Sequence, residues 1–171
     1  VLIDPTMMLQ KEEWEAVMAK PKSLKTDKYI LKAFLGQVSK EKEEELARIA
    51  KENDCEIIDI IDENSPHFGC GPEEFIYLEK NAFLVVTDSF HSCVFAILFG
   101  TPFVVFERDD KKLKSMYSRI ETLLNTFDLN YRVFDNEIDN RCLSREYSHI
   151  EEILKKKRKE ADEFIEKAFG E

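Results

Sequence analysis

The chain has 171 residues, of which 43% are hydrophobic, and it contains 13 Phe against only 5 Gly and 5 Pro. This length and composition predict one globular domain with a single core, and they exclude disordered and collagen-like proteins. Its 35 acidic and 25 basic side chains give a formal net charge of −10. We therefore expect no nucleic-acid partner, because such a partner needs a continuous basic surface.

Neither a membrane span nor a disulfide framework is expected. The longest apolar run, residues 94–99, is far shorter than the roughly twenty residues that cross a bilayer. The chain opens at Val1 without an apolar leader, and we expect that residues precede it in the whole protein. The four cysteines are widely spread and form no CxxC pair: Cys55, Cys70, Cys93 and Cys142. Such spacing is typical of reduced, intracellular thiols, so we expect a cytoplasmic protein.

The first predicted elements are a strand, a helix and a second strand. Residues 29–35 form a largely apolar run that Gly36 ends, which is typical of a strand stopping at a turn. Ser39 is a candidate N-cap for a surface helix that reaches about Asn53. Residues 56–61 are mostly apolar again and predict the second strand.

A loop, a short helix and a buried strand follow. Residues 62–70 carry Asn, Ser, Pro and Gly without apolar periodicity, which predicts a loop. Pro72 starts a helix that reaches about Asn81, because proline suits the first helical turn. Residues 83–87 are apolar up to Thr87, as expected for a parallel strand covered on both faces.

The next predicted helix, residues 90–99, is apolar nearly all round and should therefore be buried. Gly100 and Pro102 provide its stop signal. The remaining predicted elements are a strand at 103–106, a helix at 118–127, a strand at 132–134 and a charged final helix.

This alternation predicts an α/β fold, a Rossmann-like parallel sheet of five strands with helices on both faces. We expect the strand order 2-1-3-4-5, with ligands bound beyond the carboxyl ends of strands one and three. Residues 1–28 lie outside the alternation, although Trp14 and Val17 predict a short packed helix that Pro21 ends. We interpret residues 1–28 as a connector from a missing amino-terminal domain, and residues 29–171 as the Rossmann-like domain.

Residues 87–92 are the strongest candidate for a binding site, because there an apolar strand turns directly into the buried helix. A helix N-terminus offers unpaired N–H groups and a partial positive charge, so it can hold a phosphate or a carboxylate. Ser89 and His91 would add donors, and His91 can act as an acid. Spacing alone favours the alternative, in which Asp88 or Ser89 caps the helix and His91 bonds a carbonyl.

Basic side chains are expected near the same edge of the sheet. Arg108, Lys111 and Lys112 follow the fourth strand, and Arg119 enters the next helix. Arg119 would donate two hydrogen bonds to a carboxylate or phosphate, and the loop cations would close over it. Taken singly, each is more simply explained as a surface charge. The basic residues at 155–159 stand among Glu residues, which is typical of a solvated helix face.

Several other kinds of site are disfavoured. His67 and His149 have no partner at metal-ligand spacing, so we expect no metal. The GxGxxG, GxxxxGK[ST] and GxSxG motifs are absent from the sequence, which removes local support for a dinucleotide site, a P-loop or a hydrolase elbow. A phosphoacceptor role for Asp88 is disfavoured because residues 33–37 contain no carboxylate for magnesium.

Seven segments follow one another along most of the chain: Asp4-Pro5-Thr6, Glu12-Glu13-Trp14, residues 29–36, Gly71-Pro72-Glu73-Glu74-Phe75, Thr87-Asp88-Ser89-Phe90-His91, residues 102–106 and Ser118-Arg119-Ile120. In this order, they resemble the polysaccharide pyruvyl transferase family. The strand followed by Asp-Ser-Phe-His is the most specific of them. The chain resembles the carboxyl-terminal half of that family, which implies one of the two Rossmann-like domains of a glycosyltransferase-B-like arrangement.

The resemblance implies transfer of a pyruvyl group from phosphoenolpyruvate to a pair of sugar hydroxyls, forming a ketal on a polysaccharide, with no further cofactor. His91 matches the family's donor-site histidine, which implies a catalytic role. By the same resemblance, Ser89 would present its hydroxyl to the donor, and Arg119 with a loop cation such as Arg108 would balance the donor's charge. Gly36 is expected to bind the donor because it ends the first strand at the same crevice. The remaining groups would come from the missing amino-terminal domain, so the chain alone is expected to be inactive.

Ser92 departs from the family, which usually has glycine at this position, so we expect the closest approach of backbone to ligand to differ. Two other functions stay open. A glycosyltransferase of similar architecture would bind a sugar nucleotide and set Glu107 or Glu74 against the ribose hydroxyls. In a noncatalytic interaction domain, the sheet edge would dock a partner and His91 would be structural.

Overall fold

Four parallel strands form the sheet of this computed structural model, which describes residues 2–108 and 114–170. The strands are β1 (Tyr29–Ala33), β2 (Glu56–Asp59), β3 (Leu84–Thr87) and β4 (Phe103–Val105), in the order β2-β1-β3-β4. All three neighbouring pairs are parallel. The predicted order of the first four strands is therefore confirmed.

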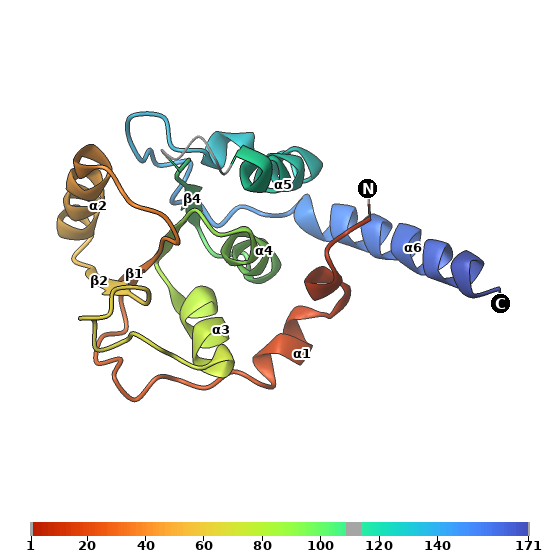
Figure 1. The fold of residues 1–171 in the computed structure, drawn as a ribbon, viewed down its shortest axis with the longest axis horizontal. Coiled ribbons are helices and arrows are strands. Elements are labelled where there is room, and N and C mark those ends of the chain that lie inside the picture. The colour runs from red at the N-terminus through yellow and green to blue at the C-terminus, as the bar shows by residue number, and fades with distance from the viewer. Residues whose placement is uncertain (1, 109–113, 171) are drawn as a thin grey trace.

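Helices cover both faces of the sheet (Figure 1). They are α2 (Lys40–Glu52), α3 (Pro72–Asn81), α4 (Phe90–Phe99), α5 (Lys114–Thr126) and α6 (Ile150–Phe169). Successive strand residues point to opposite faces. Leu31 and Val85 therefore join the core under α3, α4 and α5, whereas Ile30 and Val86 join a second core under α2. This arrangement is the Rossmann-like α/β fold that the alternation predicts.

The predicted fifth strand is wrong. Residues 130–132 instead form a 3₁₀ turn, η3 (Asn130–Arg132), and only Val133 makes a single parallel bridge to Val105 of β4. Arg132 explains the difference, because its fully buried guanidinium needs acceptors. It donates to the carbonyl oxygens of Phe103 (3.3 Å), Cys142 (2.6 Å) and Ser144 (3.0 Å). The last two of these carbonyls belong to the segment that leads to α6.

Three strands end earlier than predicted: β4 ends one residue early, at Val105, and β1 and β2 end two residues early. In β1 and β2, carboxylates take the amides that would otherwise continue the strand. Asp88 accepts hydrogen bonds from the amides of Leu35 and Gly36, so β1 stops at Ala33. Asp59 accepts one from the amide of Ile61, so β2 stops at Asp59 itself. By contrast, α3 and α4 have the bounds that the sequence predicts, and α4 ends at Gly100, whose φ of 64° is left-handed.

The amino-terminal segment adds no strand and packs on α3 and α4. It contains a 3₁₀ turn, η1 (Pro5–Met8), and a short helix, α1 (Lys11–Glu15). The Trp14 ring meets the edge of Phe95 at 5.1 Å, and its indole donates to the carbonyl of Thr6. Val17, which was expected to pack, is 56% exposed. The role of this segment as a connector to another domain stays a prediction.

The final helix, α6, begins against the domain and runs away from it (Figure 1). Arg158 ties its middle to the amino-terminal segment, donating to the carbonyls of Met7 and Leu9 and to the side-chain oxygen of Gln10. Beyond this point Phe164 and Phe169 are exposed. Among the residues that the structure describes, no helix has the length and apolar character needed to cross a membrane.

Replacing Arg132 with methionine tests its role as the anchor of the carboxyl-terminal segment. We expect Arg132→Met to lose about 3 kcal/mol of unfolding free energy, because three carbonyl oxygens lose their donor. Urea denaturation measures the change. Arg141→Met is the matched control, since that side chain is 73% exposed, and it should stay within about 0.5 kcal/mol of the wild type. Equal losses in the two variants would contradict this assignment.

Candidate active site

A buried carboxylate, Asp88, organises the carboxyl edge of the sheet. Its side chain is 4% exposed. Oδ1 accepts a hydrogen bond from the amide of Leu35 at 2.7 Å, and Oδ2 accepts one from the amide of Gly36 at 2.9 Å. Oδ2 also accepts from Nε of Arg108 at 2.7 Å. Asp88 therefore joins the loops that follow β1, β3 and β4.

Two of the predicted site residues, Gly36 and Arg108, lie in this network. A Cβ at position 36 would come within 3.1 Å of Oδ2 of Asp88 and 3.4 Å of the Arg108 side chain, so glycine allows the close approach. Arg108 also donates from Nη2 to the carbonyl of Asp88, and its side chain is 16% exposed. The Gly36 amide and Nε of Arg108 are thus bonded to Asp88, so neither group is available to a ligand. A ligand would meet only those atoms of Gly36 and Arg108 that do not bond Asp88.

The start of α4 has no side-chain cap. Ser89 is the N-cap residue, but its hydroxyl makes no capping hydrogen bond. Its amide donates to Oγ1 of Thr87 at 2.9 Å, and the Thr87 hydroxyl donates in turn to the carbonyl of Ala33. Asp88 points back toward the β1 loop instead of capping the helix. Ser89 therefore occupies the N-cap position, as the alternative has it, but neither its side chain nor that of Asp88 makes the capping hydrogen bond.

His91 lies in the first turn of α4 and is exposed. Its ring meets the ring of Phe90 at 5.4 Å between centroids and at 82°. Within residues 2–108 and 114–170, neither of its ring nitrogens has a hydrogen-bond partner. The other two histidines differ, because His67 bonds the hydroxyl of Ser23 at 2.9 Å and His149 bonds the carbonyl of Phe127 at 3.0 Å. The expected carbonyl partner of a structural His91 is thus not present in the described part.

Arg119 approaches the same place from α5. Its guanidinium carbon lies 4.1 Å from the centroid of the Phe90 ring, and its Nη2 is 3.8 Å from a carboxylate oxygen of Asp4. The side chain is 49% exposed. Phe90 therefore has Arg119 over its ring and His91 close by in a perpendicular arrangement. The sequence indicates Phe90 only as part of its motif, because the contact of this ring with Arg119 depends on how α5 packs beside α4.

Ser92 has a different role from the one expected. Its side chain is fully buried, and its hydroxyl donates to Oε1 of Glu79 in α3. The side chain therefore faces the contact between α3 and α4 and does not limit how closely a ligand approaches the backbone. The sequence did not reveal Glu79 as a partner, because the two residues come from separate helices.

The carboxylates suggested for a sugar-nucleotide site are engaged elsewhere. Glu74 accepts a hydrogen bond from the amide of Gly71 and so caps the start of α3. Glu107 is hydrogen-bonded with the phenol of Tyr117, and both this bond and burial raise the pKa of Tyr117. Each of the two carboxylates therefore already has a partner within the chain.

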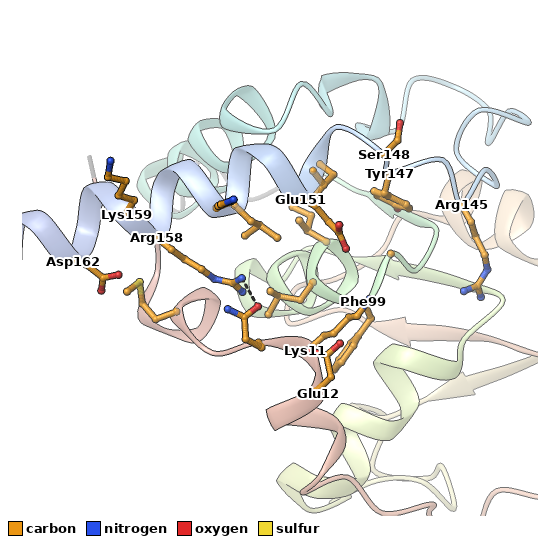
Figure 2. Close-up of a pocket in the computed structure, with 18 residues that line it drawn as sticks. Lys11, Glu12, Phe99, Arg145, Tyr147, Ser148, Glu151, Arg158, Lys159 and Asp162 are labelled. Atoms are coloured by element: carbon orange, nitrogen blue, oxygen red, sulfur yellow. Dashed lines mark hydrogen bonds between the residues drawn. The ribbon is translucent and has the colours of Figure 1, made fainter.

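A hollow of about 930 Å³ lies at the far end of α4 from His91, between α6 and the amino-terminal segment (Figure 2). Several of its polar groups already hold segments together. Arg158 bonds Gln10, Arg145 donates to the carbonyl of Ala82, and the phenol of Tyr147 donates to the carbonyl of Thr101. We place the candidate site elsewhere, because a smaller hollow of about 270 Å³ adjoins Phe90 and Arg119.

The remaining predictions concern the loop cations Lys111 and Lys112 and a metal site. Lys111 and Lys112 lie outside the described residues. Within the described ranges, no three His, Cys, Asp or Glu side chains are grouped so that they could hold a metal ion. The structure thus brings His91 and Arg119 to the ring of Phe90, which directly follows Ser89 in the chain, and it joins Gly36 and Arg108 through Asp88, the residue before Ser89.

A family model described as polysaccharide pyruvyl transferase matches residues 1–110. The chain belongs to this family. The match includes all four strands, α4 and the candidate residues Gly36, Ser89, His91 and Arg108, whereas Arg119 lies beyond it. No curated protein matches the chain in sequence. Membership of the polysaccharide pyruvyl transferase family implies a transferase that acts on a sugar acceptor.

Replacing Asp88 tests whether it organises the site of this pyruvyl transferase family member. We expect Asp88→Asn to lose about 3–5 kcal/mol of unfolding free energy, because Arg108 is left partly buried without a counter-charge. Hydrogen exchange at the amides of Leu35 and Gly36 should also become faster. Asp27→Asn is the control, since that side chain is 95% exposed, and its change should be within about 0.5 kcal/mol. Unchanged exchange at both amides would contradict the role of Asp88.

Proposed function

We propose that this chain is the donor-binding part of a polysaccharide pyruvyl transferase, which moves pyruvyl from phosphoenolpyruvate onto two hydroxyls of a sugar. The observation that supports this most directly is the state of His91. It is exposed, it has no hydrogen-bond partner among the described residues, and it stands in the first turn of a helix that lacks a side-chain cap. The family match covers this segment.

The chemistry requires an anion site and an acid. Phosphoenolpyruvate carries a carboxylate and a phosphate, and the amides at the start of α4 with the guanidinium of Arg119 suit such groups. In the reaction, the methylene carbon gains a proton as the first sugar oxygen bonds the adjacent carbon. The C–O bond to phosphate then breaks, and the second sugar oxygen closes the ketal. Each hydroxyl loses its proton: one balances the proton given to the methylene carbon, and the other leaves on inorganic phosphate. A protonated His91 would supply the proton to the methylene carbon.

The other predicted residues have supporting roles in this proposal. Ser89 would present its uncapped hydroxyl to the donor. Arg108 and Gly36 would shape the floor of the site through Asp88, and the remaining guanidinium nitrogen of Arg108 would add positive potential. No cofactor is required, because phosphoenolpyruvate itself supplies both the pyruvyl group and the leaving group.

The rest of the proposal follows from the family resemblance. A glycosyltransferase-B-like arrangement would set this domain against an amino-terminal domain, with the donor between them and the sugar acceptor held largely by the other domain. The isolated chain would then bind the donor weakly and catalyse nothing. The enzyme would work in the cytoplasm on a precursor of a cell-surface polysaccharide.

Titration of the isotope-labelled chain with phosphoenolpyruvate at low salt tests the proposal. We expect amide shifts at residues 89–92 and at Arg119, with a dissociation constant of about 1 mM, since half of the binding groups would be absent. His91→Gln should weaken binding about tenfold, because one hydrogen bond to a charged group is lost. His149→Gln is the matched control and should leave the affinity unchanged.

A parallel titration with a sugar nucleotide separates the rival functions. Shifts at residues 89–92 with the sugar nucleotide, and none with phosphoenolpyruvate, would show that the proposed donor is wrong. If neither ligand shifts these amides and His91→Gln lowers the thermal stability, His91 is structural and the interaction-domain alternative holds.

A further inference from the structure

Glu79 is a fully buried carboxyl group between α3 and α4. The hydroxyl of Ser92 donates a hydrogen bond to its Oε1, and its Oε2 has no hydrogen-bond partner among the described residues. An ionised carboxylate in such a place would lose its hydration and receive only one hydrogen bond in return. The geometry therefore disfavours the charged form.

The groups around Glu79 supply no compensating positive charge. The titratable side chains that face it are Tyr29 from β1, Cys70 from the loop before α3 and Cys93 from α4, within the part of the chain that the structure describes. Tyr29 donates its hydroxyl to the carbonyl of Leu78, so it does not serve Glu79. The neighbouring Lys80 is paired with Glu15 at 2.8 Å.

Burial raises the pKa of Glu79 to about 8, and the hydrogen bond from Ser92 acts in the opposite direction. Burial also raises the pKa of the Cys93 thiol and of the Tyr29 phenol, so both stay neutral near pH 7. The interior between α3 and α4 is thus an uncharged polar cluster at neutral pH.

We propose that Glu79 keeps its proton in the folded protein and acts as a positioning residue, which fixes the first turn of α4, and with it His91, against α3. The positional part of this inference rests on the proposed function of His91. Apolar contacts are not directional, and α4 is apolar nearly all round, so they fix its rotation only weakly. The Glu79–Ser92 hydrogen bond is directional, and Ser92 directly follows His91.

The sign of the pH dependence follows from proton counting. A glutamate in the unfolded chain ionises near pH 4.5, whereas Glu79 in the folded chain keeps its proton up to about pH 8. Between these values the folded state binds more protons than the unfolded state, so stability falls as the pH rises. Above about pH 8 both states are ionised, and the contribution of Glu79 no longer changes.

Thermal unfolding of the full chain between about pH 5 and pH 9 tests the proton on Glu79. We expect the wild type to lose several degrees of Tm relative to Glu79→Gln over this range, because the glutamine cannot ionise. Glu73→Gln, which changes an exposed residue on the same helix, should follow the wild type. In Ser92→Ala the loss should extend to higher pH, since the hydrogen bond that favours the ionised form is gone. Parallel curves for the wild type and Glu79→Gln would overturn the inference.

A second measurement uses only the wild-type protein, so it does not depend on whether a variant folds. The carboxyl carbon of Glu79 in the labelled wild-type chain should titrate with a midpoint near pH 8. A midpoint near pH 4.5, the ordinary value for a glutamate, would overturn the inference even if Glu79→Gln failed to fold.

Two measurements test the positioning role: the ring resonances of His91 and the affinity for phosphoenolpyruvate, each as a function of pH. The ring resonances of His91 should move at the Glu79 midpoint, and this change should be absent from the Glu79→Gln variant and from the ring of His149. With phosphoenolpyruvate, the affinity ratio of Glu79→Gln to wild type should rise about threefold or more from about pH 6 to pH 9. A constant ratio with no such change in the His91 ring would overturn the positioning role. If no variant binds phosphoenolpyruvate, the proposed function fails, while the Tm series and the carbon titration still decide the proton on Glu79.

Discussion

The carboxylate of Asp88 is the contact on which the candidate site depends. One side chain binds the amides of Leu35 and Gly36 and the guanidinium of Arg108, and so connects the loops after three parallel strands. A buried carboxylate is costly unless its charge is balanced and its oxygens are bonded, and here both conditions are met. Because Asp88 points toward β1, the chain enters α4 through Ser89 without a side-chain cap.

The helix that follows meets two opposing requirements. Its body is buried in the core, whereas its first turn must stay open if it is to meet a ligand. Buried polar contacts hold it on either side of that turn. Asp88 anchors the chain just before His91, and Ser92 anchors it just after His91 through Glu79. His91 is thus exposed, and its imidazole has no hydrogen-bond partner among the described residues. It stands between Asp88 and Ser92, which both hold the backbone in place. Such an arrangement orients the side chain without using its nitrogens.

The sequence predicts those features that local patterns determine. Pro72 and Gly100 mark helix ends, and the alternation of elements predicts the order of four strands. Features that depend on distant partners were not predictable. The fifth strand fails because Arg132 finds acceptors in a later loop. Arg108 was predicted to face a ligand, but its Nε meets Asp88, 20 residues earlier. The burial of Glu79 was missed because a glutamate beside a lysine on a helix is typical of solvent-exposed faces.

The local charge balance of the site explains how a protein with a formal net charge of −10 would attract an anion. Distant acidic side chains contribute little, because salt screens exposed charges beyond about 8 Å. Two carboxylates close to the site have cationic partners: Asp88 is paired with Arg108, and Asp4 lies 3.8 Å from Arg119. The dipole of α4 remains unmatched, protonation of His91 adds to it, and a bound anion would compete with Asp4 for the half-exposed Arg119 guanidinium. The potential that a bound anion would meet is therefore set by a few positive groups around Phe90, and the composition of the whole chain does not predict it.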